Sequence, residues 1–202
     1  MTEEPQQRRD NVDLAAIRRQ VEEILGDAPE LMKLALEEML RESNPDEEAE
    51  MDTAGRIGSQ SGTVSELTAI ADLKPGGADR LRRIFRAVRG NFSGASKVGT
   101  VHDMRFVFLD NDTRILFATT YDGDWEPYIE DFATRIPELM DLIFASVEGW
   151  PGIKDPSVKD FIAEHQVQAE GWYAAFPHLS VADTRRMLKN QHALDEFLDK
   201  VG

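Results

Sequence analysis

The chain of 202 residues contains no cysteine. Disulfide bonds, thiolate metal ligands and cysteine nucleophiles are therefore excluded. The chain also has no run of about 18 apolar residues, so we expect no membrane-spanning helix. Its first residues, MTEEPQQRRDN, lack the apolar stretch of a secretory signal. These absences together predict a soluble, cytoplasmic protein.

Basic residues are in the minority. The chain carries 38 acidic and 23 basic residues, which gives a formal net charge of −15. A surface of that sign repels phosphate backbones and anionic lipid headgroups, so the composition argues against nucleic-acid and membrane partners. The excess is uneven, since residues 1–62 hold 16 acids and only 7 bases.

Recognised catalytic and metal-binding motifs are also absent. The sequence has no Gly-x-Ser-x-Gly, no phosphate-binding P-loop, no dinucleotide fingerprint and no His-Glu-x-x-His. Asp122, Asp124 and Glu126 gather acids at a predicted helix start, as a calcium loop would. However, Pro127 stands where that loop requires glycine, and helix capping explains the same acids. We therefore predict no metal site.

Three segments differ in character. Residues 1–42 form an acidic helical appendage, in which apolar residues such as Ile17 and Val21 recur at helical spacing. Two interpretations of these helices remain open: they pack against each other or the rest of the chain, or they bind a protein partner and order on contact. Residues 43–62 are small, acidic and glycine-rich and predict a linker. Residues 63–202 form the main domain.

The main domain alternates between strand and helix patterns. Strands are predicted near 64–72, 102–110, 113–121 and 166–177, and helices at 78–90, from 122 onwards with a break at Pro137, and at 181–201 after a Ser180 cap. The order β-α-β-β-α-β followed by a helix predicts an α+β, ferredoxin-like fold with a four-stranded antiparallel sheet.

The second strand is apolar on both sides. Met104, Phe106 and Phe108 alternate with Val107 and Leu109, and a sheet that is apolar on both faces is buried on both. Helices of the domain cover one face only. The second cover is either the N-terminal helices or a second copy of the sheet, and we predict a homodimer.

Several segments resemble one bacterial family of domains. The stretches HDMRFVFLD, TRILFATTYDGDWEPYIEDF, GWPG and WYAAFPHLSV are similar to landmarks of dimeric α+β-barrel domains. The wider superfamily includes dye-decolorising haem peroxidases, chlorite dismutase-like haem proteins and cofactor-free monooxygenases. The resemblance implies a barrel with an apolar pocket and an oxidoreductase that depends on haem or a small molecule. Of the peroxidase pattern Gly-x-x-Asp-Gly, only Asp122-Gly123 is present.

Four residues are candidates for binding a ligand in such a pocket: His102, Arg105, Tyr121 and Trp172. Strand alternation places His102 and Arg105 on opposite faces unless a bulge intervenes. The alternative for His102 is a satisfied hydrogen bond at a strand end. We expect Arg105 to be buried and to pair either with a carboxylate, Asp72 or Glu170, or with an anionic ligand group.

His178 follows the fourth predicted strand and is a candidate axial ligand for haem, or else a simple loop residue. Two functions therefore compete. One is a ligand-binding or enzymatic α+β-barrel with an apolar pocket. The other is a non-catalytic interaction protein that uses its acidic N-terminal helices, residues 1–42, to bind a partner.

Overall fold

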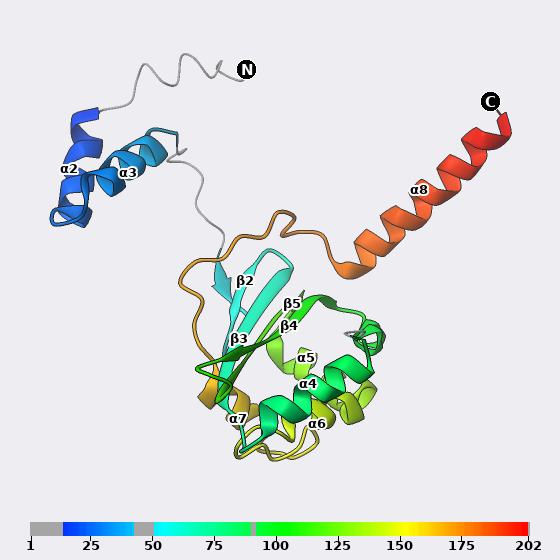
Figure 1. Ribbon diagram of the computed structural model, residues 1–202. Helices are drawn as coiled ribbons and strands as arrows, with labels where there is room; N and C mark the ends of the chain where they lie inside the picture. The colour runs from blue at the N-terminus through cyan, green and yellow to red at the C-terminus, as the bar shows by residue number, and fades with distance from the viewer. Residues whose placement is uncertain (1–13, 43–50, 90–91, 202) are drawn as a thin grey trace. The chain divides into compact units, whose positions relative to one another are not determined.

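The computed structural model describes residues 14–42, 51–89 and 92–201. It divides the chain into two compact units, Met1–Ala49 and Glu50–Gly202 (Figure 1). The first unit contains the helices α2 (Leu14–Leu25) and α3 (Glu30–Glu42). Ile17 and Val21 are its buried side chains, at the spacing that the sequence analysis singled out. Two ion pairs join the helices: Arg18 with Glu37 and Lys33 with Glu22.

The second unit is built on an antiparallel sheet in the order β1-β2-β3-β5-β4. Its strands are β1 (Asp52–Thr53), β2 (Ser59–Ser61), β3 (Val64–Asp72), β4 (Val101–Leu109) and β5 (Arg114–Asp122). The predicted hairpin turn between β4 and β5 is present, and Asp110, Asn111 and Asp112 all adopt the left-handed conformation there, with φ between 49° and 70°. The chain is thus an α+β protein, as predicted.

The helices of this unit lie between and after the strands. They are α4 (Gly77–Ala87), a 3₁₀ turn (Ser93–Lys97), α5 (Trp125–Arg135), α6 (Pro137–Phe144), α7 (Val158–His165) and α8 (Val181–Val201). The predicted break at Pro137 is confirmed, because α6 begins there as a separate helix. Ser180 caps α8 as expected: its hydroxyl accepts the backbone N–H of Asp183 at 3.0 Å.

One face of the sheet forms the core. Leu67, Ile115, Phe117 and Tyr121 point from β3 and β5 toward the helices, and Phe106 joins them from β4. Large buried side chains of two helices pack against them: Trp125, Tyr128 and Phe132 from α5, and Met140, Ile143 and Phe144 from α6. Figure 1 shows α4, α5 and α6 together on this side of the sheet.

We call the opposite face the outer face. Strand register places its residues in five rows across β3, β5 and β4. They are Val64–Asp122, Glu66–Thr120–Asp103, Thr68–Ala118–Arg105, Ile70–Leu116–Val107 and Asp72–Arg114–Leu109. None of these side chains belongs to the main core cluster, although Val64, Glu66 and Ala118 are buried, and Val107 is 43% exposed. The first three rows of the outer face are therefore mostly polar, and the fourth row is apolar.

The predicted linker needs correction. Two strands lie within the segment 43–62: β1 (Asp52–Thr53) pairs with β2 (Ser59–Ser61), and β2 pairs with β3. These short strands show no apolar alternation, because their residues are Asp, Thr, Ser and Gln. The second compact unit accordingly begins at Glu50 rather than at residue 63.

The predicted fourth strand, 166–177, is wrong. This segment makes one bridge between Gln166 and Ala69, and Val167 donates to the carbonyl of Thr68 at 2.8 Å. Beyond that it is irregular. The predicted strand would have to pair with the free edge of β3, and β2 already pairs with that edge along Val64–Glu66. The complete ferredoxin-like order thus stays a prediction.

Candidate functional site

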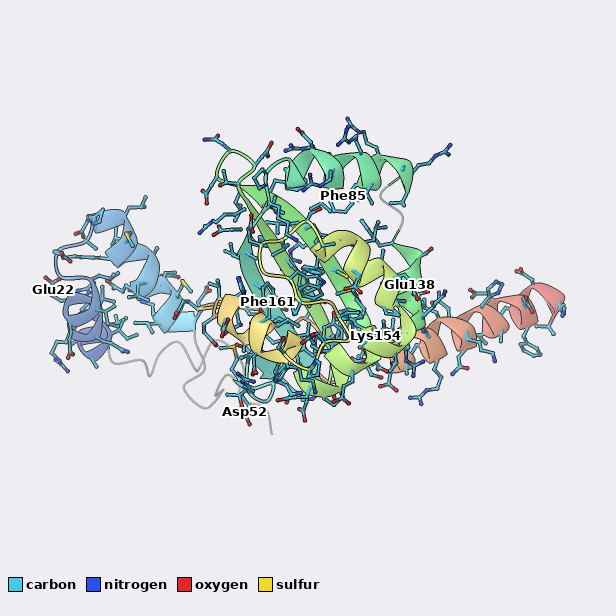
Figure 2. The ribbon with its side chains drawn as sticks, turned by 90° about the horizontal axis from the view of Figure 1, so that it is seen from below. Glu22, Asp52, Phe85, Glu138, Lys154 and Phe161 are labelled. Atoms are coloured by element: carbon cyan, nitrogen blue, oxygen red, sulfur yellow. The ribbon has the colours of Figure 1, made fainter. Side chains whose placement is uncertain are left out.

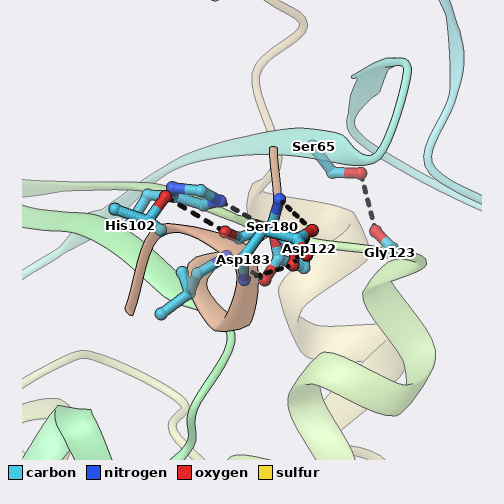
Figure 3. Close-up of polar contacts among 8 residues, drawn as sticks. Ser65, His102, Asp122, Gly123, Ser180 and Asp183 are labelled. Carbon is cyan, nitrogen blue, oxygen red and sulfur yellow. Dashed lines mark hydrogen bonds and ion pairs between the residues drawn. The ribbon is translucent and has the colours of Figure 1, made fainter. Parts of the chain in front are cut away.

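His102 lies at an irregularity of the sheet. A β-bulge between Val101 and Asp103 interrupts the pairing of β4 with β5. The extra residue re-aims the side chain, so that His102 Nε2 lies 2.7 Å from Asp122 Oδ1, on the outer face (Figure 3). An ionised carboxylate only accepts hydrogen bonds, so Nε2 is the donor. The bulge brings His102 and Arg105 to the same face, which alternation alone does not.

Asp122 also holds the start of α8. Its second carboxylate oxygen accepts the backbone N–H of Val181 at 2.9 Å. Figure 3 shows His102, Asp122, Ser180 and Asp183 converging at this point. The hydroxyl of Ser180 donates to Asp183 at 2.6 Å and is therefore not placed as a nucleophile for His102. The arrangement anchors a helix rather than forming a catalytic triad.

Arg105 is exposed, contrary to the expectation of a buried mid-strand cation. Its side chain is 60% exposed and pairs with Asp103, two residues earlier on β4. Neither Asp72 nor Glu170 is its partner. Because the outer face is open to solvent here, this guanidinium needs no buried carboxylate, and the ion pair is of the exposed kind that contributes little to stability.

Glu66 is a buried acid that the sequence analysis did not single out. It lies on the outer face, is only 5% exposed, and its Oε1 has no hydrogen-bond partner among the described residues. Thr68 donates to its other oxygen at 3.2 Å. Burial raises the pKa of the Glu66 carboxyl, and hydrogen bonds from Thr68 and Ser59 offset part of that rise. The sequence of β3 does not predict the burial of Glu66, because the burial depends on segments that are distant in the chain.

Tyr121 points the other way, into the core. Its ring is fully buried and stacks on Tyr128 with a centroid distance of 3.8 Å. Tyr128 in turn shares a 2.5 Å hydrogen bond with Thr119. Burial raises the pKa of the Tyr121 phenol far above its usual range, so it stays protonated. Tyr121 and the pair His102 and Arg105 therefore lie on opposite faces and cannot line one pocket.

Trp172 and His178 lie on the irregular segment that replaced the predicted strand. Trp172 is half-buried and His178 is exposed. A Cβ atom at Gly62 would lie 2.6 Å from His178 Nδ1, so the imidazole rests directly on that glycine. The carbonyl of the preceding Pro177 accepts the N–H of Thr63 at 2.7 Å. His178 thus packs against the start of β3 and does not point into the apolar cavity described next.

That cavity lies between the sheet and helices α5 to α7 and measures about 30 Å³. Its lining is apolar except for His165, whose Nδ1 donates to the carbonyl of Phe161 at 2.8 Å and whose ring stacks on Phe161. Such a volume holds about one water molecule. A haem does not fit in it, and His178 is not part of its lining.

The described part of the chain contains no cluster of three or more potential metal ligands. It also has no helix that is both long and apolar enough to cross a membrane. At the acids of the predicted calcium loop, Asp124 stands at the N-cap of α5 without a side-chain cap bond, while Asp122 anchors α8.

Large apolar side chains are exposed outside the core. In α8 only Val181 is buried, although the helix has 21 residues. Four of its exposed residues, Met187, Leu194, Leu198 and Val201, repeat at intervals of seven, four and three, which places them on one stripe. Leu188 and Phe197 flank this stripe. The segment before α8 adds Tyr173 and Phe176, which are 85% and 70% exposed.

Comparison of the chain with known protein families, curated proteins and solved structures finds no match.

Proposed function

We propose that this protein is a non-catalytic interaction protein that pairs with a second copy of itself through the apolar stripe of α8. The observation that carries the proposal is the stripe itself: Met187, Leu194, Leu198 and Val201 are all more than half exposed on a helix with a firmly anchored start. An apolar stripe with coiled-coil spacing is stabilised by burial against another helix or a sheet face.

The outer sheet face supports the same reading. Its fourth row, Ile70–Leu116–Val107, is apolar and lies outside the hydrophobic core. The exposed rings of Tyr173 and Phe176 lie on the segment that leads into α8. A two-fold dimer uses the same patch on both copies, and aromatic residues are favoured in such patches.

The strand order supports a ferredoxin-like arrangement within each copy. In the order β3-β5-β4, the strand that comes last in the chain lies between the two earlier ones, and α4 connects β3 to β4. A fourth strand would extend the sheet beyond β3, where β2 and Gln166 now share the edge. The homodimeric α+β barrel implied by the sequence resemblance is the corresponding quaternary proposal.

Paired variants of α8 test the interaction. Leu194→Asp places a charge in the stripe, whereas Ala193→Asp places the same charge on an exposed position outside it. We expect Leu194→Asp to weaken self-association by at least about tenfold, because a carboxylate buried in an apolar interface is costly. Ala193→Asp should leave it unchanged. Light scattering after size exclusion measures both, and equal behaviour of the two variants would contradict the proposal.

A further inference from the structure

Helix α4 and its flanks carry the opposite charge to the rest of the protein. Residues 74–97 contain seven Lys and Arg residues and a single acid, Asp79. The whole chain has a net charge of −15, so the remainder has a net charge of −21. Figure 2 shows nitrogen-tipped side chains along the outer side of α4. Basic residues are therefore concentrated on one element of an acidic molecule.

Most of these arginines have no carboxylate partner. Arg83, Arg86 and Arg89 form no ion pair with any described residue, although the chain contains 38 acids. Arg80 donates only to the backbone carbonyl of Pro75. Elsewhere in the described chain, arginines such as Arg135 and Arg56 do pair with acids. The guanidinium groups of α4 are thus left free to bind an anion.

Arg82, by contrast, is fixed. Its two terminal nitrogens donate to the two oxygens of Asp112 at 2.5 and 2.6 Å, and its guanidinium lies 4.5 Å from the centroid of the Phe108 ring. The Asp112 hydrogen bonds raise the pKa of Arg82 and lower the pKa of Asp112. Because both terminal nitrogens bind Asp112, Arg82 is a fixed edge beside α4 rather than a free anion-binding group.

A shallow hollow brings these groups together. Its lining residues are Arg82, Phe85, Arg86 and Arg89. Phe85 forms an aromatic floor and is held by Phe92, Phe106 and Phe108, with centroid distances of 5.4 to 6.2 Å. Arg89 follows the end of α4 in a left-handed conformation, with φ of 53°, which is unusual for a residue with a side chain.

We propose that this hollow binds a small ligand that carries two or more phosphate groups. Guanidinium forks match phosphate oxygens in a bidentate manner, and the forks of Arg86 and Arg89 line the hollow without a carboxylate partner among the described residues. The fork of Arg82 is already bound to Asp112, so Arg82 borders the hollow and two guanidinium groups remain for the phosphates. The net charge of −21 elsewhere repels an extended polyanion, so a compact ligand is favoured over a nucleic acid.

Calorimetric titration of the full chain with sodium tripolyphosphate tests the proposal. We expect saturable binding that weakens as salt rises from about 50 mM to about 200 mM. Arg86→Ala and Arg89→Ala should each weaken it by roughly tenfold, because each removes one guanidinium from the hollow. The matched control is Lys189→Ala, an exposed cation on α8, which should bind as the wild type does.

Three results would overturn the assignment. The first is no binding of tripolyphosphate at millimolar concentration. The second is an equal loss in the Lys189→Ala control, which would indicate general attraction to the whole surface. The third is tighter binding of a single-stranded oligonucleotide than of tripolyphosphate at the same salt concentration. Arg86 and Arg89 lie outside α8, and Lys189 lies outside the apolar stripe of α8, so the outcome is independent of the dimer proposal.

Discussion

Arg105 illustrates how the surroundings of a strand decide the role of one residue. A cation in the middle of the apolar strand Val101–Leu109 suggested burial and a functional partner. On the outer face it is instead exposed and paired with its neighbour Asp103. The burial of Arg105 depends on whether another segment packs over the outer face, and the sequence of β4 does not determine that.

We therefore expect Arg105→Met to cost less than about 1 kcal/mol of unfolding free energy, because exposed ion pairs contribute little. Leu67→Ala, a substitution at a fully buried position on β3, serves as the contrast and should cost about 2–5 kcal/mol. Urea denaturation of both variants measures the two costs. A loss of several kcal/mol in Arg105→Met would show that this guanidinium is buried after all.

Glu66 gives the molecule a pH-dependent stability. Its folded-state pKa is raised above the ordinary value of 4.5, so the folded protein binds this proton more tightly than the unfolded chain does. Its contribution is fully present below pH 4.5 and is lost as the pH rises through the folded-state pKa. Glu66→Gln removes that loss, so the variant should gain stability relative to the wild type as the pH rises above about 4.5.

Asp155→Asn is the control of opposite sign. Hydrogen bonds from the Ser157 hydroxyl and N–H lower the pKa of Asp155, so its contribution is present above the ordinary value and lost as the pH falls. That variant should lose stability relative to the wild type as the pH rises. Denaturant midpoints across the pH range measure both variants against the wild type. A stability difference between Glu66→Gln and the wild type that does not change with pH would refute the burial of this acid.

At the scale of elements, long periodic segments were predictable and short polar ones were not. The sequence indicated α8, the β4–β5 hairpin and the break at Pro137, because apolar period, turn residues and proline each act locally. The sequence did not indicate β1 and β2, because these short strands pair through their backbones and show no apolar alternation. Once β2 takes the edge of β3, the segment 166–177 cannot form the expected strand.

The candidate site shows the same division. His102 and Arg105 could be identified from the sequence, and strand alternation showed that only a bulge would place both on the same face. It could not place the bulge between Val101 and Asp103, since nothing in that tripeptide breaks the strand pattern. Tyr121 was wrongly grouped with these residues, because strand alternation alone does not show which face of β5 packs against the core. Burial of Glu66 depends on distant segments and was not predictable.

The β1–β2 hairpin depends on a close approach of backbones. Gly58 has φ of 84°, and a Cβ there would lie 2.5 Å from the carbonyl oxygen of Glu66. Gly123 has φ of 80° with open space around it. Both Ala variants incur about 1–2 kcal/mol of backbone strain, and Gly58→Ala should add a further 1–3 kcal/mol, roughly, from the overlap. Thermal unfolding that ranks the two variants equally would refute the close approach.

At the scale of the whole molecule, the division into two units can be tested by truncation. The fragment 50–202 contains the complete sheet and should unfold cooperatively, as the full chain does. The fragment 63–202 lacks the hairpin, including the fully buried Ala54, whose carbonyl accepts the N–H of Trp125 at 2.9 Å. We expect this shorter fragment to lose at least about 2 kcal/mol, measured by urea denaturation. Equal stability of the two fragments would show that residues 51–62 contribute nothing to the folded domain, as expected of a linker.

Self-association through α8 is the central proposal, and sedimentation equilibrium of the full chain tests it most directly. An exposed apolar stripe on an anchored helix predicts a reversible monomer–dimer equilibrium with a dissociation constant of about 10 μM or tighter. The mass should rise with concentration from 22.8 kDa toward twice that value. A mass of 22.8 kDa at every concentration, up to the millimolar range, would contradict the proposal.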